Sequence, residues 1–117
     1  MRFTIYTADC TGNERNAIYP HKVGITSRRE LGEAAAFDHV CAAYKDNYRS
    51  RDNFLASDVA VMDCDNDHSE NPNDWVMPAD VQAAFPGVTF AVHYSRSHMR
   101  EKNGKAARPK FHVLFPI

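Results

Sequence analysis

Hydrophobic and polar residues alternate with a period of two in several short segments of this chain. In Arg2–Thr7, Phe3 and Ile5 fall on one face and more polar side chains on the other, which is typical of a half-buried β-strand. Val59–Cys64 is instead a short apolar run that ends in acids, and it indicates a buried strand. Together, the patterns predict strands at residues 2–7, 21–26, 59–64, 88–94 and 110–115.

Two further segments show helical signals. Ser27–Glu30 has the form of a capping box, in which the serine accepts the N–H of the glutamate and the glutamate side chain reaches back to the cap. Apolar residues then recur at helical spacing to about Lys45. A second, shorter helix opens at Met77–Asp80 and ends near Phe85. Residues 46–58 are predicted to be a polar connection, with Phe54 and Leu55 as its apolar anchors.

This order of elements predicts an α+β (mixed α/β) fold, with helices packed on one side of a mixed or antiparallel sheet. The length suits a single domain, residues 1–117. The apolar and charged fractions, 44% and 25%, are ordinary for a soluble globular protein, and no segment resembles a signal peptide or a membrane span. Three widely spaced cysteines indicate neither a disulfide framework nor a zinc site. We therefore expect a cytoplasmic protein without a membrane partner.

The net charge of −1 conceals two blocks of opposite charge. Six acids and no Lys or Arg lie between residues 63 and 80, whereas six bases and one acid lie between residues 96 and 110. Such blocks are often merely solvated faces. An acidic block can also hold divalent cations and a basic block phosphates, and a protein that needs both typically handles nucleotides. The bases are Arg96, Arg100, Lys102, Lys105, Arg108 and Lys110.

The pleat of a strand places residues two apart on the same face. In the last three predicted strands, this rule gathers polar side chains on the face opposite Phe111 and Val113. If the strands are neighbours, one open face carries carboxylates, imidazoles, a hydroxyl and an ammonium, which is the inventory of an active site. The residues of that face are Asp63 and Asp65, His93 and Ser95, and Lys110 and His112.

The Asp-x-Asp pair after an apolar strand is a common way to hold Mg²⁺ or Mn²⁺. Mg²⁺ takes one or two carboxylates and completes its shell with water and phosphate oxygens. Two such ions can stabilise the attacking and leaving oxygens of a phosphoryl displacement. Other interpretations stay open: the pair can be an acidic turn, the basic loop can simply be solvent-exposed, and His112 can be structural. A calcium loop of the EF-hand type is disfavoured, because His68 stands where that loop has glycine.

Two motifs resemble those of the archaeo-eukaryotic primase superfamily, in particular the primase-polymerase domains of phages and mobile elements. VAVMDCDND (Val59–Asp67) resembles the first motif, an apolar strand that ends in Asp-x-Asp. Tyr94–Ile117 resembles the second motif region, which pairs a small polar residue with a histidine. The resemblance covers most of residues 51–117, whereas the first half matches only in its strand–helix layout.

The resemblance implies a role for each matching residue. Asp63 and Asp65 would bind the catalytic metals, and His112 would contact the phosphates of the incoming nucleotide, with Ser95 or Ser97 as its polar partner. The nucleotide would also meet Arg96 and Lys110. The triphosphate or the template backbone would meet the remaining bases, Arg100, Lys102, Lys105 and Arg108.

The family has a third motif, another metal-binding acid on a strand after the histidine strand, and the sequence stops at Ile117 before any such strand. We therefore expect the N-terminal part of a catalytic domain with an RRM-like core and an incomplete metal site, which does not polymerise alone. The expected function is that of a DNA primase-polymerase, a nucleotidyltransferase, in the replication of a phage or mobile element. Its partners would be nucleoside triphosphates, a single-stranded DNA template, and a helicase domain or replication proteins. The alternatives are a non-catalytic single-strand-binding module and a metal-dependent nuclease.

Overall fold

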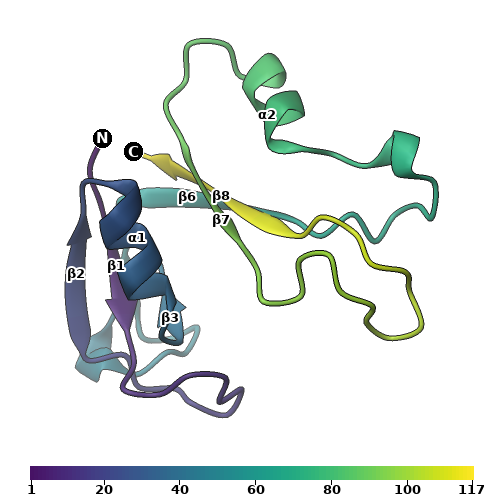
Figure 1. The fold of residues 1–117 in the computed structure, drawn as a ribbon. Coiled ribbons are helices and arrows are strands. Elements are labelled where there is room, and N and C mark those ends of the chain that lie inside the picture. The colour runs from purple at the N-terminus through teal and green to yellow at the C-terminus, as the bar shows by residue number, and fades with distance from the viewer. The chain divides into compact units, whose positions relative to one another are not determined.

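The computed structural model describes residues 1–117, and its fold is α+β, as the sequence predicts. Two α-helices accompany three antiparallel sheets (Figure 1). The chain divides into two compact units. The first unit comprises Met1–Ala60 with Phe115–Ile117, and the second comprises Val61–Leu114. No helix is long and apolar enough to cross a membrane.

The first unit is built on a three-stranded sheet with β1 (Phe3–Thr7) at its centre. β2 (His21–Ile25) and β3 (His39–Val40) pair with β1 in antiparallel orientation. Phe3 and Ile5 of β1 are fully buried, whereas Thr4 and Tyr6 are only half-buried. The predicted alternation along this strand is therefore confirmed, and its apolar face forms the core of the unit.

Helix α1 (Arg28–Ala35) packs against β1 and β2 and buries Leu31, Ala34 and Ala35 (Figure 1). Ser27 is its N-cap, because its Oγ accepts the backbone N–H of Glu30 at 3.2 Å. The Glu30 carboxylate instead accepts the backbone N–H of Thr26 at 3.1 Å, one residue before the cap. The capping serine is thus confirmed, while the reciprocal bond reaches one residue further back than predicted.

The prediction that this helix continues to Lys45 is wrong. The chain leaves the helix after Ala36 and turns at Asp38, whose carboxylate accepts the backbone N–H groups of Gly12 at 2.7 Å and Asn13 at 2.8 Å. The following residues then pair with β1 as strand β3. Tertiary strand pairing overrides helical spacing here, because apolar periodicity is only a weak guide to the position of a helix end.

The segment predicted to be a polar connection contains a small hairpin. β4 (Ala43–Tyr44) pairs with β5 (Phe54–Ala56), and the 3₁₀-helix η1 (Lys45–Asn47) begins the link between them. Phe54 and Leu55 are 54% and 63% exposed. The prediction that these two residues anchor the connection in the core is therefore wrong, since their two-stranded sheet buries neither side chain.

The sheet that carries the second unit has the strand order β6-β8-β7, formed by β6 (Val59–Cys64), β8 (Phe111–Pro116) and β7 (Ala91–Tyr94). Phe111 and Val113 of the central strand are fully buried, so their predicted core face is confirmed. Leu114, which alternation places on the opposite face, is also buried. The face of β8 that carries His112 is therefore buried at the Leu114 position, toward the C-terminal end of the strand.

Two predictions about these strands need correction. The bounds of β6 match the prediction, but the strand is not buried, because it lies at the edge of the sheet and Val61 is 47% exposed. β7 begins at Ala91 and not at Val88. The Val88 N–H donates to the Phe85 carbonyl in a turn that follows helix α2 (Pro78–Ala84), where Gly87 has φ +76°.

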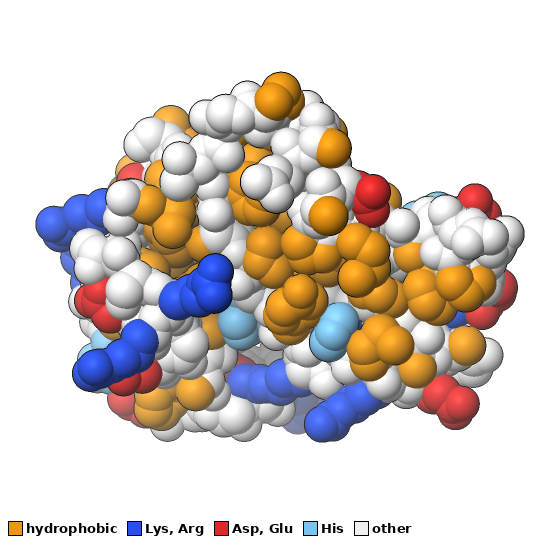
Figure 2. All heavy atoms as spheres, turned by 45° about the horizontal axis from the view of Figure 1, so that its top comes forward, with side chains coloured by type: hydrophobic (Ala, Val, Ile, Leu, Met, Phe, Trp, Pro, Cys, Tyr) orange, Lys and Arg blue, Asp and Glu red, His pale blue; other side chains and the backbone are white.

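Apolar side chains also reach the surface. Figure 2 shows hydrophobic side chains at the surface, with Lys and Arg side chains also exposed. In the second unit, Phe85, Val88 and Tyr94 are each more than two-fifths exposed.

Candidate functional site

An aspartate and a histidine meet on the sheet of the second unit. β8 is the central strand, so His112 has β6 on one side and β7 on the other. Its Nε2 lies 3.5 Å from Oδ1 of Asp63 on β6. On the other side His112 is paired in register with His93, and the two ring centroids are 6.4 Å apart. The Asp63 and His112 side chains are 68% and 36% exposed, so a ligand can reach both from solvent.

The second carboxylate, Asp65, is also exposed and stands one residue beyond β6. Its Oδ1 accepts the backbone N–H of Asp67 at 3.1 Å, which closes a turn after the strand. The residue between them, Asn66, has φ +57° and is buried. Asparagine tolerates this left-handed conformation better than most residues. The turn therefore gives Asp65 and Asp67 fixed positions beyond the strand.

Asn66 also ties this turn to two other segments. Its side-chain nitrogen donates to the carbonyls of Val76 at 3.0 Å and Pro109 at 2.9 Å, and its Oδ1 accepts the Val76 N–H at 2.7 Å. This positioning residue was not predicted from the sequence. A turn-favouring asparagine directly after a strand was the available signal, but its partners lie 10 and 43 residues away.

Two predicted phosphate-binding lysines bind an aspartate in this structure. Lys110 Nζ lies 3.2 Å from Asp67 Oδ1, and its side chain is only 13% exposed. Lys105 Nζ donates to the Asp67 carbonyl at 3.3 Å and lies 3.9 Å from Oδ1. The hydrogen bond from Lys110, aided by the nearby cations, lowers the pKa of Asp67. Part of the acidic block thus neutralises part of the basic block.

Arg108 requires a correction, because it was predicted to bind triphosphate or template. Its side chain is fully buried, and its Nη1 donates to the carbonyls of Asn66 at 2.9 Å and Ser69 at 3.0 Å. Its Nη2 donates to Glu70 Oε1 at 2.6 Å, and the guanidinium carbon lies 5.6 Å from the Trp75 ring centroid. These contacts occupy the guanidinium within the unit, so Arg108 holds the acidic loop in place and does not present a charge to a ligand.

The loop after β7 holds Ser95, Arg96 and Ser97. The backbone N–H of Ser95 donates to the Lys110 carbonyl at 2.9 Å, which extends the pairing of β7 with β8. The Ser95 hydroxyl is buried and has no hydrogen-bond partner. Arg96 is exposed and Ser97 half-buried, in a turn. His98, in the same turn, is structural: its Nδ1 accepts the Lys110 N–H at 3.1 Å.

The tip of the basic loop is a tight hairpin that leaves its charges in solvent. Lys102 and Lys105 exchange both backbone hydrogen bonds, at 3.2 and 2.9 Å. Asn103 and Gly104 between them have φ of +53° and +75°, as a type I′ turn requires. The side chains of Arg100 and Lys102 are exposed. Of the four bases predicted to bind triphosphate or template, these two are the ones that fully face solvent.

The donor set suits a hard cation better than a soft one. No group of three or more His, Cys, Asp and Glu side chains is gathered for a metal ion. Two exposed carboxylates nonetheless match Mg²⁺ or Mn²⁺, since Mg²⁺ is usually held by one or two carboxylates plus water and substrate oxygens. Burial raises the pKa of Cys64, and the charges of Asp63 and Asp65 raise it further. The thiol between the two aspartates therefore stays protonated, which disfavours thiolate ligation.

Fold and site together define an α+β protein with exposed carboxylates and an imidazole on one sheet. No match to the chain exists among protein-family models, curated proteins or solved structures.

Proposed function

We propose that the second unit carries the metal- and nucleotide-binding site of a primase-polymerase, a nucleotidyltransferase that uses Mg²⁺ or Mn²⁺. The observation that carries the proposal is the 3.5 Å approach of His112 Nε2 to Asp63 Oδ1 between neighbouring strands. An anion-binding imidazole next to a cation-binding carboxylate suits a ligand that is both metal-bound and phosphorylated. Two residues from the two motifs that resemble the primase family thus meet in one site.

Each side chain has a distinct part in this proposal. Asp63 and Asp65 hold the divalent metal, which when bound neutralises triphosphate charge and activates a 3′-hydroxyl. His112 donates a hydrogen bond from Nε2 to a phosphate oxygen and orients the triphosphate. Arg100 and Lys102, exposed on the basic loop, attract the triphosphate or the template backbone.

Other predicted residues support the site indirectly. Lys110 and Lys105 hold Asp67, so they position the turn that bears Asp65. Ser95 lies where β7 meets the Lys110 carbonyl, and Arg96 and Ser97 follow it in the same turn. In the proposal, Ser95, Arg96 and Ser97 border the bound nucleotide while the aspartates hold its metal. The biological setting that the motifs favour is DNA replication in a phage or mobile element, on a single-stranded template and with a helicase domain or replication proteins.

The test is metal-dependent nucleotide binding. It is measured by calorimetry with a deoxynucleoside triphosphate in the presence of Mn²⁺ or Mg²⁺. We expect binding that disappears with a chelator and falls roughly 100-fold or more in the variant Asp63→Asn with Asp65→Asn, given typical losses on removing a preorganised electrostatic contact. Glu101→Gln, an exposed acid in the same unit, is the matched control and should bind as the parent chain does. Unchanged binding in the double variant refutes the metal role.

The same preparations separate the two alternatives. A metal-dependent nuclease cleaves single-stranded or duplex DNA without added nucleotides. A non-catalytic binding module holds single strands equally well with and without chelator and ignores the triphosphate. His112→Gln should weaken triphosphate binding while leaving Mn²⁺ binding by the aspartates intact. Loss of Mn²⁺ binding in this variant would make the histidine part of the metal site and not a phosphate contact.

A further inference from the structure

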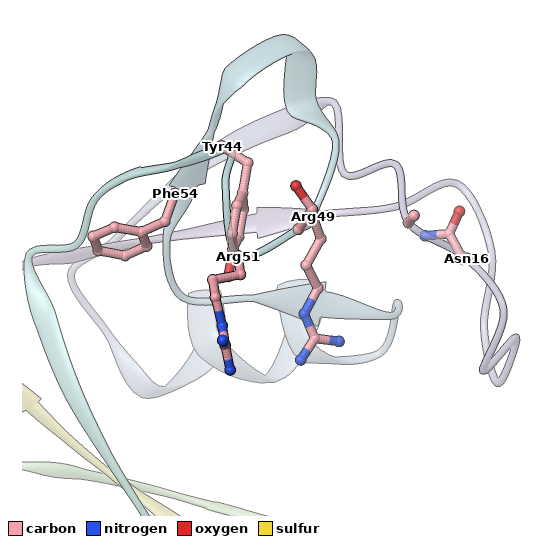
Figure 3. Close-up of a pocket in the computed structure, with 7 residues that line it drawn as sticks. Asn16, Tyr44, Arg49, Arg51 and Phe54 are labelled. Atoms are coloured by element: carbon pink, nitrogen blue, oxygen red, sulfur yellow. The ribbon is translucent and has the colours of Figure 1, made fainter.

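The first unit has a shallow pocket of about 480 Å³ beside the β4–β5 hairpin. It lies apart in sequence from every residue of the proposed metal site, and no function has been given to it so far. Figure 3 shows the side chains that line it. The lining residues are Asn16, Ala17, Tyr44, Arg49, Ser50, Arg51 and Phe54.

Backbone pairing joins the two segments that form the pocket walls. The Arg49 N–H donates to the Ala17 carbonyl at 2.7 Å, and the Tyr19 N–H donates to the Asn47 carbonyl at 3.0 Å. Between these bonds, Ile18 and Tyr48 form an antiparallel bridge. The backbone at Arg49 is therefore fixed by its pairing with residues 17–19, so the start of this side chain has a defined position.

The loop that carries both arginines is also braced from within. Asn53 donates from its side chain to the carbonyls of Lys45 at 3.4 Å and Tyr48 at 3.2 Å. Its own N–H donates to Ser50 Oγ at 3.2 Å, and its carbonyl accepts the Lys45 N–H at 2.8 Å. These bonds cross the loop from one end to the other. A preformed loop loses less conformational entropy when it binds a ligand.

Two aromatic rings form the apolar side of the pocket. Tyr44 and Phe54 contact each other edge to face, with centroids 6.2 Å apart and planes at 78°. Tyr44 is held in place because it packs against the buried cluster of Ala8, Tyr19 and Val40. Phe54 is 54% exposed. An exposed ring supported by a fixed neighbour offers a flat face to a planar ligand.

The pocket also has two cations that lack an anion. Arg49 and Arg51 are exposed, and neither guanidinium makes an ion pair or a side-chain hydrogen bond within the chain. By contrast, Arg29 on α1 binds Glu33 at 3.1 Å. Figure 3 shows the Arg49 and Arg51 side chains extending in the same direction from the loop. Two unsatisfied guanidinium groups that extend the same way from one loop are well suited to consecutive phosphates.

We infer that this pocket binds single-stranded nucleic acid, with Arg49 and Arg51 on the phosphates and an unpaired base stacked on Phe54. Cations that follow the backbone and an aromatic platform for a base are the usual elements of a single-strand site. A duplex has no free base face for the ring, and a shallow open pocket does not enclose a mononucleotide. The inference is independent of the proposed metal site, because all its residues belong to the first unit.

The test is binding of a fluorescein-labelled oligothymidylate, measured by fluorescence anisotropy at several salt concentrations. A length of about 12 nucleotides lies within the usual range of single-strand site sizes. The variant Arg49→Gln with Arg51→Gln should weaken binding. It should also make the slope of log affinity against log salt shallower by about 1.4, since each phosphate contact on a single strand contributes about 0.7. Phe54→Ala should weaken binding roughly 5- to 100-fold, and Phe54→Trp should restore it.

Three controls decide between this site and its rivals. Arg28→Gln removes an exposed arginine of the same unit outside the pocket and should leave binding within about twofold, because lone surface charges are largely screened. Adding a chelator should also leave it unchanged, which separates this inference from the proposed metal site. Equal losses in Arg28→Gln and the double arginine variant overturn the inference in favour of non-specific charge. Competition by free thymidine triphosphate at equal nucleotide concentration overturns it in favour of a mononucleotide site.

Discussion

Replacing Arg108 with alanine tests how the second unit holds its acidic loop. The guanidinium is fully buried, and its Nη1 bridges the carbonyls of Asn66 and Ser69. Alanine leaves the buried Asn66 carbonyl without this donor. It also removes the hydrogen bonds to Ala106 at 3.0 Å and to Ser69, whose carbonyl keeps the Trp75 indole N–H at 2.9 Å. The change should therefore destabilise the unit far more than removal of a surface arginine.

The magnitude follows from these contacts. The Asn66 carbonyl, a buried acceptor that loses its donor, accounts for about 1–3 kcal/mol, and the lost hydrogen bonds to Ser69 and Ala106 for about 0.5–1.5 kcal/mol each. The lost contact with the Trp75 ring adds about 0.5–1 kcal/mol. We leave out the bond to Glu70, whose side chain is 64% exposed and regains water. The expected loss is about 3–5 kcal/mol, a large share of the roughly 5–15 kcal/mol that stabilises a typical domain.

Urea unfolding followed by Trp75 fluorescence measures this loss directly, since Trp75 is the only tryptophan and lies beside Arg108. Arg100→Ala is the matched control, because it removes an exposed arginine from the same loop and should change stability by less than about 0.5 kcal/mol. Arg108→Lys should recover only part of the loss, since an ammonium cannot reproduce the planar fork. If Arg108→Ala unfolds at the same urea concentration as Arg100→Ala, the buried bridge does not stabilise the unit.

Three further changes test other parts of the fold. The folded pKa of Asp67 is lowered by Lys110, so its stabilising contribution is present above the unfolded pKa and is lost as pH falls through the folded value, below about pH 4. Acid unfolding followed by circular dichroism should show this component, and Lys110→Met should remove it. Asn66→Ala should cost about 3 kcal/mol or more in urea unfolding, and Asn66→Gly about 1 kcal/mol less, because glycine accepts φ +57°. Ser27→Ala should cost about 1 kcal/mol in thermal unfolding, since the N–H of Glu30 loses its cap, and a cost near zero would argue against the capping assignment.

Alternation predicted the strands well where one face is buried. β1 and β8 lie within a residue of their predicted bounds, because Phe3, Ile5, Phe111 and Val113 occupy the core at every second position. The same kind of pattern failed in the stretch after α1. There, the hydrogen bonds of Asp38 to the loop before β2 decide where the helix ends, and these partners lie some 25 residues away in sequence.

The candidate site shows the same limit of local patterns. The pleat predicted that Asp63 and His112 share a face, but their 3.5 Å approach depends on the strand order β6-β8-β7, which no local pattern specifies. For Arg108, sequence reasoning failed because a base in a polar loop is usually exposed. Its burial depends on carbonyls 39 and 42 residues away. Whether a charged side chain is buried depends on its partners in the fold, which its neighbours in sequence do not reveal.

The ion pairs of Asp67 show how the acidic and basic blocks interact. Lys105 and Lys110 bind Asp67, so these three charges are largely neutralised within the second unit. Their role is to hold the turn after β6 in place. Of the three acids between residues 63 and 67, Asp63 and Asp65 stay exposed without a lysine or arginine partner. A cation that enters from solvent therefore meets these two carboxylates before any other acid of the turn, because Asp67 is already neutralised. Because Asp67 is neutralised, the uncompensated negative charge of this turn lies on Asp63 and Asp65, where the proposed metal site needs it.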